Sequence, residues 1–159
     1  MKDILKILEK DARTTPQQIS TITDRPVAEV EKIIKKAEEE RTIVKYKTIV
    51  NWQRLDEEQV WALIEVRVQP QREVGFDAVA ERIYRFPQVR SAYLVSGTYD
   101  LAVLVMDKSM QEVAAFVASK LAPLEGVQGT TTHFLLKRFK EDGEILDGQE
   151  DTKRLPLTL

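Results

Sequence analysis

The sequence contains no cysteine and a single histidine, His133, among its 159 residues. The absence of cysteine excludes disulfides, thiolate chemistry and cysteine-bound metals together. With one histidine, a zinc site would need carboxylates for nearly all of its ligands, so we expect neither a metal nor another cofactor. His133 lies among apolar residues of an expected strand, which favours a packed, hydrogen-bonded side chain over a ligand or a base.

Long apolar runs are also missing. No stretch approaches the roughly 20 apolar residues that are needed to cross a bilayer. Residues 1–4 lack the apolar core of a secretory signal. We therefore expect a cytoplasmic protein that has no contact with a membrane.

The chain lacks an excess of positive charge, since 24 Lys and Arg are balanced by 26 Asp and Glu. A net charge of −2 argues against a protein that coats nucleic acid through bulk positive charge. The distribution is uneven, however. Residues 1–50 hold 11 basic and 9 acidic residues, and the remainder holds 13 and 17. This asymmetry has the sign expected if the first part meets phosphate and the second does not.

The first 50 residues have the pattern of three short helices followed by a basic β-ribbon. Apolar residues at helical spacing predict a helix over residues 3–10. A Thr-Pro pair at Thr15 starts a second short helix, and Pro26 opens a third, longer one. In residues 42–50, β-branched and aromatic residues alternate with lysines, which predicts a ribbon. This order is that of a winged helix-turn-helix domain.

Seven residues of this first part are candidates for contacts with double-stranded DNA. They lie at helix starts, opposite the apolar stripe of the third helix, and on the ribbon: Thr15, Arg25, Lys32, Lys35, Lys36, Lys45 and Lys47. For the helix lysines, the alternative is a solvated face that contacts nothing. The third helix is itself acidic, with three lysines and five glutamates over residues 26–40. Of these, Glu29 and Glu31 would face phosphate at a cost.

Beyond a polar linker at residues 51–59, strands and helices alternate. The expected strands cover residues 60–68, 89–96, 101–106 and 127–136, and the expected helices cover 75–86 and 107–122. The order β-α-β-β-α-β is that of a ferredoxin-like sandwich, which we place at residues 60–140. Residues 141–159 are expected to form a charged C-terminal tail. The fold class is therefore α+β, with a winged helix-turn-helix before a ferredoxin-like domain.

The join between the two middle strands carries more polar groups than a hairpin needs. Gly97 would suffice for the backbone of the turn. Thr98, Tyr99 and Asp100 nevertheless follow it directly. A surplus of polar groups beside strand-forming residues is where a small ligand could be held.

Four short segments, in register across both halves, carry a family resemblance. They are ILEKDAR at 7–13, EEERTIVKY at 38–46, VSGTYDL at 95–101, and LAPLEGV at 121–127 with Thr130, Thr131 and Thr132 after it. Together they resemble the Lrp/AsnC family, the feast/famine transcription regulators of bacteria and archaea, over roughly residues 2–140. The resemblance implies a homodimer whose ferredoxin-like sheets pack face to face, often assembled further into octamers. It also implies a small effector, an amino acid or a related compound, bound between dimers near the Gly-x-Tyr-Asp loop.

On this resemblance the effector site consists of residues from the join and from the last strand: Gly97, Thr98, Tyr99, Asp100, Thr131 and Thr132. The Asp100 carboxylate would pair with the ammonium of an amino acid, while nearby N–H groups and the two threonine hydroxyls receive its carboxylate. The alternative is that Asp100 only accepts hydrogen bonds from its own turn. Tyr99 either walls the pocket or packs in the dimer interface.

Five other positions carry narrower expectations. The family usually has glycine where this chain has Arg41, and a side chain strains a left-handed position, so we expect a different turn there. Trp52 and Trp61 flank the linker and are expected to anchor the hinge, stacking on nucleic acid being the alternative. Arg67 and Arg90 are interpreted as surface residues in ion pairs.

The leading hypothesis is a sequence-specific, DNA-binding transcriptional regulator that responds to an amino acid by changing how its dimers associate. One alternative is an enzyme like the sirohaem decarboxylases, which share the two-domain plan. Such chemistry would want histidines and arginines lining a large pocket, so we expect no enzyme. A third possibility is a ligand-binding assembly module with weak DNA binding, which the acidic third helix and Arg41 motivate.

Overall fold

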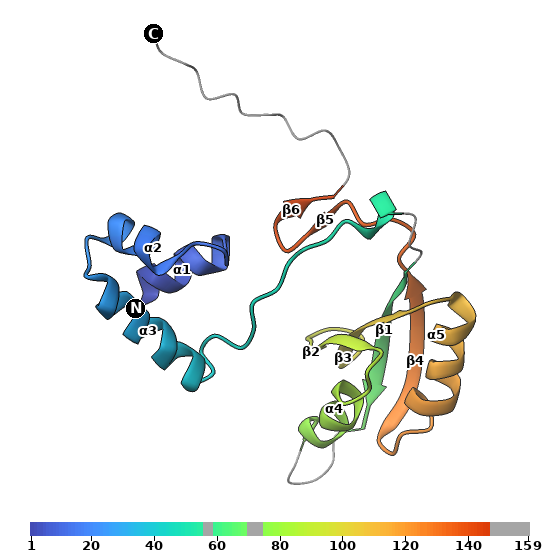
Figure 1. Cartoon of the computed structure of the whole chain (residues 1–159). Helices are drawn as coiled ribbons and strands as arrows, with labels where there is room; N and C mark the ends of the chain where they lie inside the picture. Colours follow the sequence, from blue (N-terminus) through green and yellow to red (C-terminus); the bar gives the residue numbers. More distant parts are fainter. Residues whose placement is uncertain (56–58, 70–74, 147–159) are drawn as a thin grey trace. The chain divides into compact units, whose positions relative to one another are not determined.

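The computed structural model describes residues 1–55, 59–69 and 75–146 (Figure 1). The chain divides into two compact units, Met1–Ile49 and Val50–Leu159. No helix within the described residues is long and apolar enough to cross a membrane.

The first unit contains three helices, α1 (Lys2–Lys10), α2 (Pro16–Thr23) and α3 (Val27–Glu39). Their apolar stripes meet in a small core formed by Ile4, Leu8, Ile19 and Val30. The three helices confirm the predicted periodicity. α2 begins with a capping box: the Thr15 hydroxyl accepts from the Gln18 N–H at 3.3 Å, and the Thr15 N–H donates to Gln18 Oε1 at 2.8 Å.

The turn between α2 and α3 is three residues long. Asp24 adopts the left-handed conformation, with φ 52° and ψ 43°. A short polar side chain tolerates this conformation better than most. The Arg25 N–H donates to the Ser20 carbonyl at 3.2 Å, and Pro26 caps α3. The turn therefore fixes how α3 leaves α2.

The segment after α3 differs from two expectations. Arg41 itself adopts the left-handed conformation, with φ 55°, so the expected change of turn is wrong. Its N–H donates to the Glu38 carbonyl at 3.0 Å, which satisfies the end of the helix. Residues 42–50 form no strand, so the predicted β-ribbon is also wrong for this chain. Strand-forming side chains make a ribbon only when a partner strand pairs with them, and no described strand does so.

The second unit contains an antiparallel sheet of four strands, β1 (Val60–Val68), β2 (Val89–Leu94), β3 (Leu101–Asp107) and β4 (Val127–Phe134), in the order β2-β3-β1-β4. Two helices, α4 (Asp77–Tyr84) and α5 (Met110–Phe116), pack on the sheet, and α5 continues into a π-helical turn at Val117–Leu121 (Figure 1). This arrangement confirms the ferredoxin-like sandwich.

Alternating residues of the two central strands make the core beneath these helices. β1 contributes Ile64, Val66 and Val68, β3 contributes Leu101, Val103 and Val105, and the helices contribute Val79, Ile83, Phe116 and Leu121. The intervening residues of β1 must project from the other face of the sheet. This face, here called the open face, carries Trp61, Leu63, Glu65 and Arg67 of β1. Within the described residues of the second unit, α4 and α5 pack on the opposite face and leave this one uncovered.

The end of the described chain is more ordered than a charged tail. β5 (Lys140–Glu141) pairs with β6 (Glu144–Ile145) as a short hairpin. Leu146 after it is buried, and its carbonyl accepts a hydrogen bond from Asn51 Nδ2 at 2.7 Å. Asn51 precedes a 3₁₀ turn, η1 (Trp52–Leu55). Parts of the predicted linker (56–58) and tail (147–159) lie outside the described residues.

Candidate functional site

A cavity of about 310 Å³ lies on the open face of the sheet, where β1 ends and β4 begins. We call it the Arg67 cavity. It is lined by residues of β1, of β4 and of the join between β2 and β3: Glu65, Arg67, Thr98, Tyr99, Gly129 and Thr131. Three of the six predicted effector residues, Thr98, Tyr99 and Thr131, are thus brought together.

Arg67 lies over β4 because its partner there has no side chain. The register pairs Arg67 with Gly129. A Cβ added at Gly129 would lie 2.8 Å from Arg67 Nη2 and 3.4 Å from its Nε. Within the described chain, no carboxylate lies within ion-pair distance of this guanidinium, so the expected surface ion pair of Arg67 is wrong. The group is positioned by backbone contact and remains available to a ligand.

Glu65 supplies the opposite charge in the same cavity. Its Oε1 lies 3.2 Å from His133 Nε2, so the histidine has a polar partner, but its side chain is 52% exposed and the expected packing is wrong. Glu65 and Arg67 are two positions apart on one strand, so both project from the open face. A carboxylate and a guanidinium facing one small cavity match the two charges of an amino acid.

Asp100 has a structural role that the sequence does not predict. Its Oδ2 accepts a hydrogen bond from the Val68 N–H at 2.8 Å, and its own N–H donates to the Val66 carbonyl at 3.1 Å. These bonds hold the join against the end of β1, so one oxygen of the carboxylate already has a backbone partner. Asp100 does not line the cavity, and neither does Gly97, whose φ of 138° serves the turn.

The two threonines that were predicted to act together lie on opposite faces. Thr131 pairs with Glu65 on the open face, whereas Thr132 pairs with Ile64, which is buried beneath the helices. Because neighbouring strand residues alternate, the two hydroxyls cannot both face the cavity. The structure therefore does not bring Thr132 into the Arg67 cavity.

Three residues of the cavity were missed by the sequence interpretation: Glu65, Arg67 and Gly129. A usable signal was present for two of them. Residues 62, 64, 66 and 68 are all apolar, so the charged residues between them had to share the opposite face. The role of Gly129 could not be found this way, because it depends on which strand lies beside β1.

The lysines predicted to contact DNA are exposed on α3 and on the segment after it. Lys35 Nζ lies 3.9 Å from Glu39 and Lys36 Nζ lies 3.7 Å from Glu40, each pair one helical turn apart. Exposed pairs of this kind contribute little and separate readily. Lys32 has no carboxylate within ion-pair distance among the residues described. Lys45 and Lys47 are exposed beyond the end of the helix.

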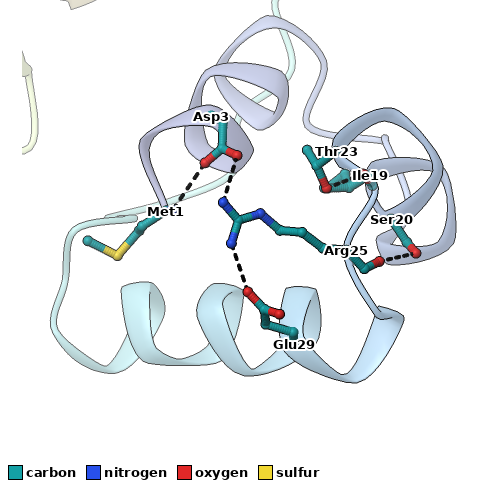
Figure 2. Close-up of polar contacts among 7 residues, drawn as sticks. All are labelled: Met1, Asp3, Ile19, Ser20, Thr23, Arg25 and Glu29. Carbon is teal, nitrogen blue, oxygen red and sulfur yellow. Dashed lines mark hydrogen bonds and ion pairs between the residues drawn. The ribbon is translucent and has the colours of Figure 1, made fainter.

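The Arg25 guanidinium lies between α1 and α3 and is bonded to both (Figure 2). Its Nη1 donates to Glu29 Oε1 of α3 at 2.7 Å, and its Nη2 donates to Asp3 Oδ2 of α1 at 3.3 Å. Glu29 and Asp3 raise the pKa of the Arg25 guanidinium further above its ordinary value. The guanidinium that was predicted to contact DNA is thus occupied within the unit. It also neutralises Glu29, one of the glutamates expected to oppose phosphate.

Tyr46 joins the segment after α3 to the end of that helix. Its hydroxyl donates to Glu38 Oε1 at 2.9 Å. Partial burial, followed by the neighbouring Glu38, raises the pKa of the phenol. This contact holds the segment that carries Lys45 and Lys47 close to the C-terminal end of α3.

The described residues contain no group of three or more His, Asp or Glu side chains that could hold a metal ion.

Known proteins resemble this chain over both the first unit and the unit that holds the Arg67 cavity. Residues 61–145 match the family model of the Lrp/AsnC ligand-binding domain. The chain is 47% identical to the uncharacterized HTH-type transcriptional regulator YugG of Bacillus subtilis, over 96% of this chain and 93% of that protein. It is 30% identical to the HTH-type transcriptional regulator FL11 of Pyrococcus furiosus, over 91% of this chain and 92% of that protein.

A solved structure shares the fold. The complex of the transcriptional regulator NMB0573 of Neisseria meningitidis with L-Met superposes with a TM-score of 0.69 at 21% identity, over 87% of this chain and 89% of that chain. These relatives are named as transcriptional regulators and not as enzymes. The chain belongs to the Lrp/AsnC family of transcriptional regulators.

Proposed function

We propose that the Arg67 cavity binds an amino acid and that binding changes how the protein engages double-stranded DNA. The observation that carries the proposal is the presence of Arg67 and Glu65 in one cavity. The guanidinium can receive an α-carboxylate through two parallel hydrogen bonds, and Glu65 can receive the ammonium. The volume of about 310 Å³ suits a small ligand. The L-Met complex of the Neisseria regulator supports this class of ligand.

In this proposal the predicted effector residues have different tasks. The Thr98 and Thr131 hydroxyls complete the polar lining, and Tyr99 forms part of the wall. Asp100 and Gly97 position the join that carries Thr98 and Tyr99. Side-chain specificity for one amino acid over another would come from the part of the cavity beyond the two charged groups.

DNA is proposed to be contacted by the first unit. We infer that α2, the turn at Asp24 and α3 act as a helix-turn-helix within a DNA-binding domain of residues 1–50, with α3 as the recognition helix. Lys32, Lys35 and Lys36 would contact bases or phosphates, and the segment after α3 would lie along the phosphate backbone. Thr15 and Arg25 would act indirectly: Thr15 fixes the start of α2, and Arg25 fixes the placement of α3.

Residues 60–140 are proposed to combine effector binding with assembly. Neither described helix of the second unit, α4 or α5, covers the open face, which supports a homodimer formed through this face and further association to octamers in the cytoplasm. An effector bound at the edge of such an interface would shift the population of assemblies, and through it the spacing of the DNA-binding domains.

The proposal is tested by a thermal-shift screen of the twenty amino acids on the wild-type chain and on Arg67→Gln. We expect one amino acid or a few to raise the unfolding temperature of the wild type and to have no effect on Arg67→Gln. Arg90→Gln is the matched control, because Arg90 lies on the same sheet outside the Arg67 cavity.

Two results would contradict the proposal. One is a wild-type chain that responds to none of the twenty amino acids. The other is an equal response in Arg67→Gln. A gel shift with the protein's own upstream DNA, with and without the active amino acid, then tests the link to DNA. Failure to bind this DNA at low salt would favour the assembly module instead.

A further inference from the structure

A second cavity, of about 560 Å³, opens at the opposite end of the sheet, where β1 begins and β4 ends. We call it the Arg138 cavity. Its walls include Trp52, Trp61, Leu135, Leu136 and Arg138, all from the second unit. It shares no lining residue with the Arg67 cavity. Nothing in the proposed amino-acid response uses it.

Trp61, one of the residues that line this cavity, has a donor that lacks an acceptor. The indole Nε1 of Trp61 is buried, and it has no hydrogen-bond partner within the part of the chain that the structure describes. Buried tryptophan N–H groups usually find a partner, because an unsatisfied donor is destabilising. An acceptor oxygen supplied by a ligand would satisfy this group.

The Arg138 cation lies against the same indole and is weakly paired. The Arg138 guanidinium lies over the Trp61 ring, 4.7 Å from its centroid. Its side chain is only 13% exposed, and Glu141 approaches it at 3.9 Å, the outer limit for an ion pair. A mostly buried guanidinium next to an unsatisfied N–H forms a receptor for a carboxylate.

The remaining walls are mixed: Gln53, Gln59 and Lys137 are polar, and the other side chains are apolar and open to solvent. Met110 is 50% exposed, Leu135 38% and Leu136 89%, and Trp52 adds a second indole. No aspartate or glutamate occurs among the described residues that line the cavity. This is the difference from the Arg67 cavity, in which Glu65 is available to an ammonium.

From these observations we propose that the Arg138 cavity binds a small apolar monocarboxylate without an amino group. The carboxylate receives hydrogen bonds from the Arg138 guanidinium and from the Trp61 indole. The hydrocarbon or aryl body lies against Trp52 and the two leucines. The protein would then respond to an acid in addition to an amino acid, through a separate site.

Intrinsic fluorescence tests this directly, because the chain has only two tryptophans and both line the cavity. The full chain is titrated with 4-methylpentanoate and, separately, with phenylacetate. We expect a saturable change of tryptophan emission with at least one of them, and which of the two binds identifies an aliphatic or an aryl body. 4-Methylpentanamide and leucine, which lack the charge or add an ammonium, should bind at least about tenfold more weakly.

Variants assign the signal to the site. Arg138→Gln should weaken binding of the acid at least about tenfold. Arg85→Gln, an arginine of the same unit paired with Glu81 away from the cavity, should leave it unchanged, and so should Arg67→Gln. Because Arg138 is mostly buried, Leu136→Glu is a second test. It places a carboxylate at an exposed wall and should also abolish binding of the acid.

The proposal is overturned if neither acid gives a saturable change, or if leucine binds as tightly as 4-methylpentanoate. It is also overturned if folded Arg138→Gln and Leu136→Glu both bind the acid like the wild type. Loss of acid binding in Arg67→Gln would assign the signal to the Arg67 cavity and would equally refute a separate site. Failure of the amino-acid screen alone leaves these expectations intact, so the two proposals can fail independently.

Discussion

Arg25 and Arg67 belong to different units, and their guanidinium groups have opposite surroundings. Arg25 is held between Asp3 and Glu29, so its charge is used to join helices. Arg67 rests on the backbone of Gly129 and has no ion pair in the described chain, so its charge faces a cavity. The sequence predicts the reverse: a DNA contact for Arg25 and a surface ion pair for Arg67. Whether a surface cation is available to a ligand depends on its neighbours across the fold, and not on its residue type.

The largest expected effect is a loss of DNA affinity when the lysines of α3 are removed. It tests whether cations in exposed ion pairs can still bind a ligand. Although Lys35 and Lys36 are paired, their pairs are exposed and should give way to phosphate. We expect the combined Lys32→Ala, Lys35→Ala and Lys36→Ala variant to bind DNA at least about 100-fold more weakly. The slope of log affinity against log salt should fall by about 0.9 for each phosphate that the variant no longer neutralises. Gel shifts at several salt concentrations measure both quantities, and an unchanged slope would refute contact by these lysines.

Gly129→Val tests how Arg67 is positioned. The new Cβ would lie 2.8 Å from Arg67 Nη2, so the flexible guanidinium must move. Valine is well suited to a strand, and the fold should persist. We expect affinity for the amino acid identified in the screen to fall about tenfold, which corresponds to about 1.4 kcal/mol. Calorimetric titration measures it, with Gln128→Ala on the same strand as the control. Equal affinity in both variants would show that the Arg67 position is not decisive.

Arg25→Gln should have a smaller effect on DNA, because its guanidinium serves the contacts between helices. We expect DNA affinity to fall by less than about threefold at fixed salt, far less than for the α3 lysines. The unfolding temperature of the first unit should decrease, since the variant breaks the links to Asp3 and Glu29 together. Lys6→Gln on α1 is a surface control without these links. A fall in DNA affinity like that of the lysine variant would make Arg25 a direct contact.

The smallest effect concerns Asp3 and acid pH. The N-terminal amine donates a hydrogen bond to this carboxylate and, together with nearby backbone N–H groups, lowers its pKa from 3.8 to about 2. A carboxyl with a lowered pKa in the folded state stabilises the fold above the pKa of the unfolded chain. We therefore expect this stabilisation to be complete above about pH 4 and to disappear as the pH falls toward 2. The wild type and Asp3→Asn should differ in unfolding temperature at pH 7 and converge near pH 2. A constant difference across this range would contradict the assignment.

Much of the fold could be predicted from local pattern. β1 was predicted with its observed bounds, because its alternation is regular and polar residues flank it. The helices were predicted from their apolar stripes, although α5 proved shorter because it passes into a π-helical turn. The ribbon at residues 42–50 failed for a physical reason: strand propensity does not supply a partner strand. Pairing is a property of the whole chain or of its assembly.

The site was less accessible to prediction than the fold. The polar residues at the join lie at the end of the sheet that holds the Arg67 cavity, and Thr98, Tyr99 and Thr131 line it. The bonds of Asp100 to Val66 and Val68 could not be predicted, because these partners lie on a strand that is distant in sequence. Gly129 had no local signal at all. The contribution of a glycine of this kind is the space it leaves for another strand's side chain.

The hydrogen bond from Asn51 to the Leu146 carbonyl has a consequence for biosynthesis. The two residues are 95 positions apart, so Asn51 leaves the ribosome long before its partner has been made. Closing a contact of such separation is slow compared with forming the hairpins and helices between its ends. We expect this bond to form among the last contacts of the second unit. The start of that unit, including Trp52, then acquires its final position only when translation has passed the C-terminal hairpin.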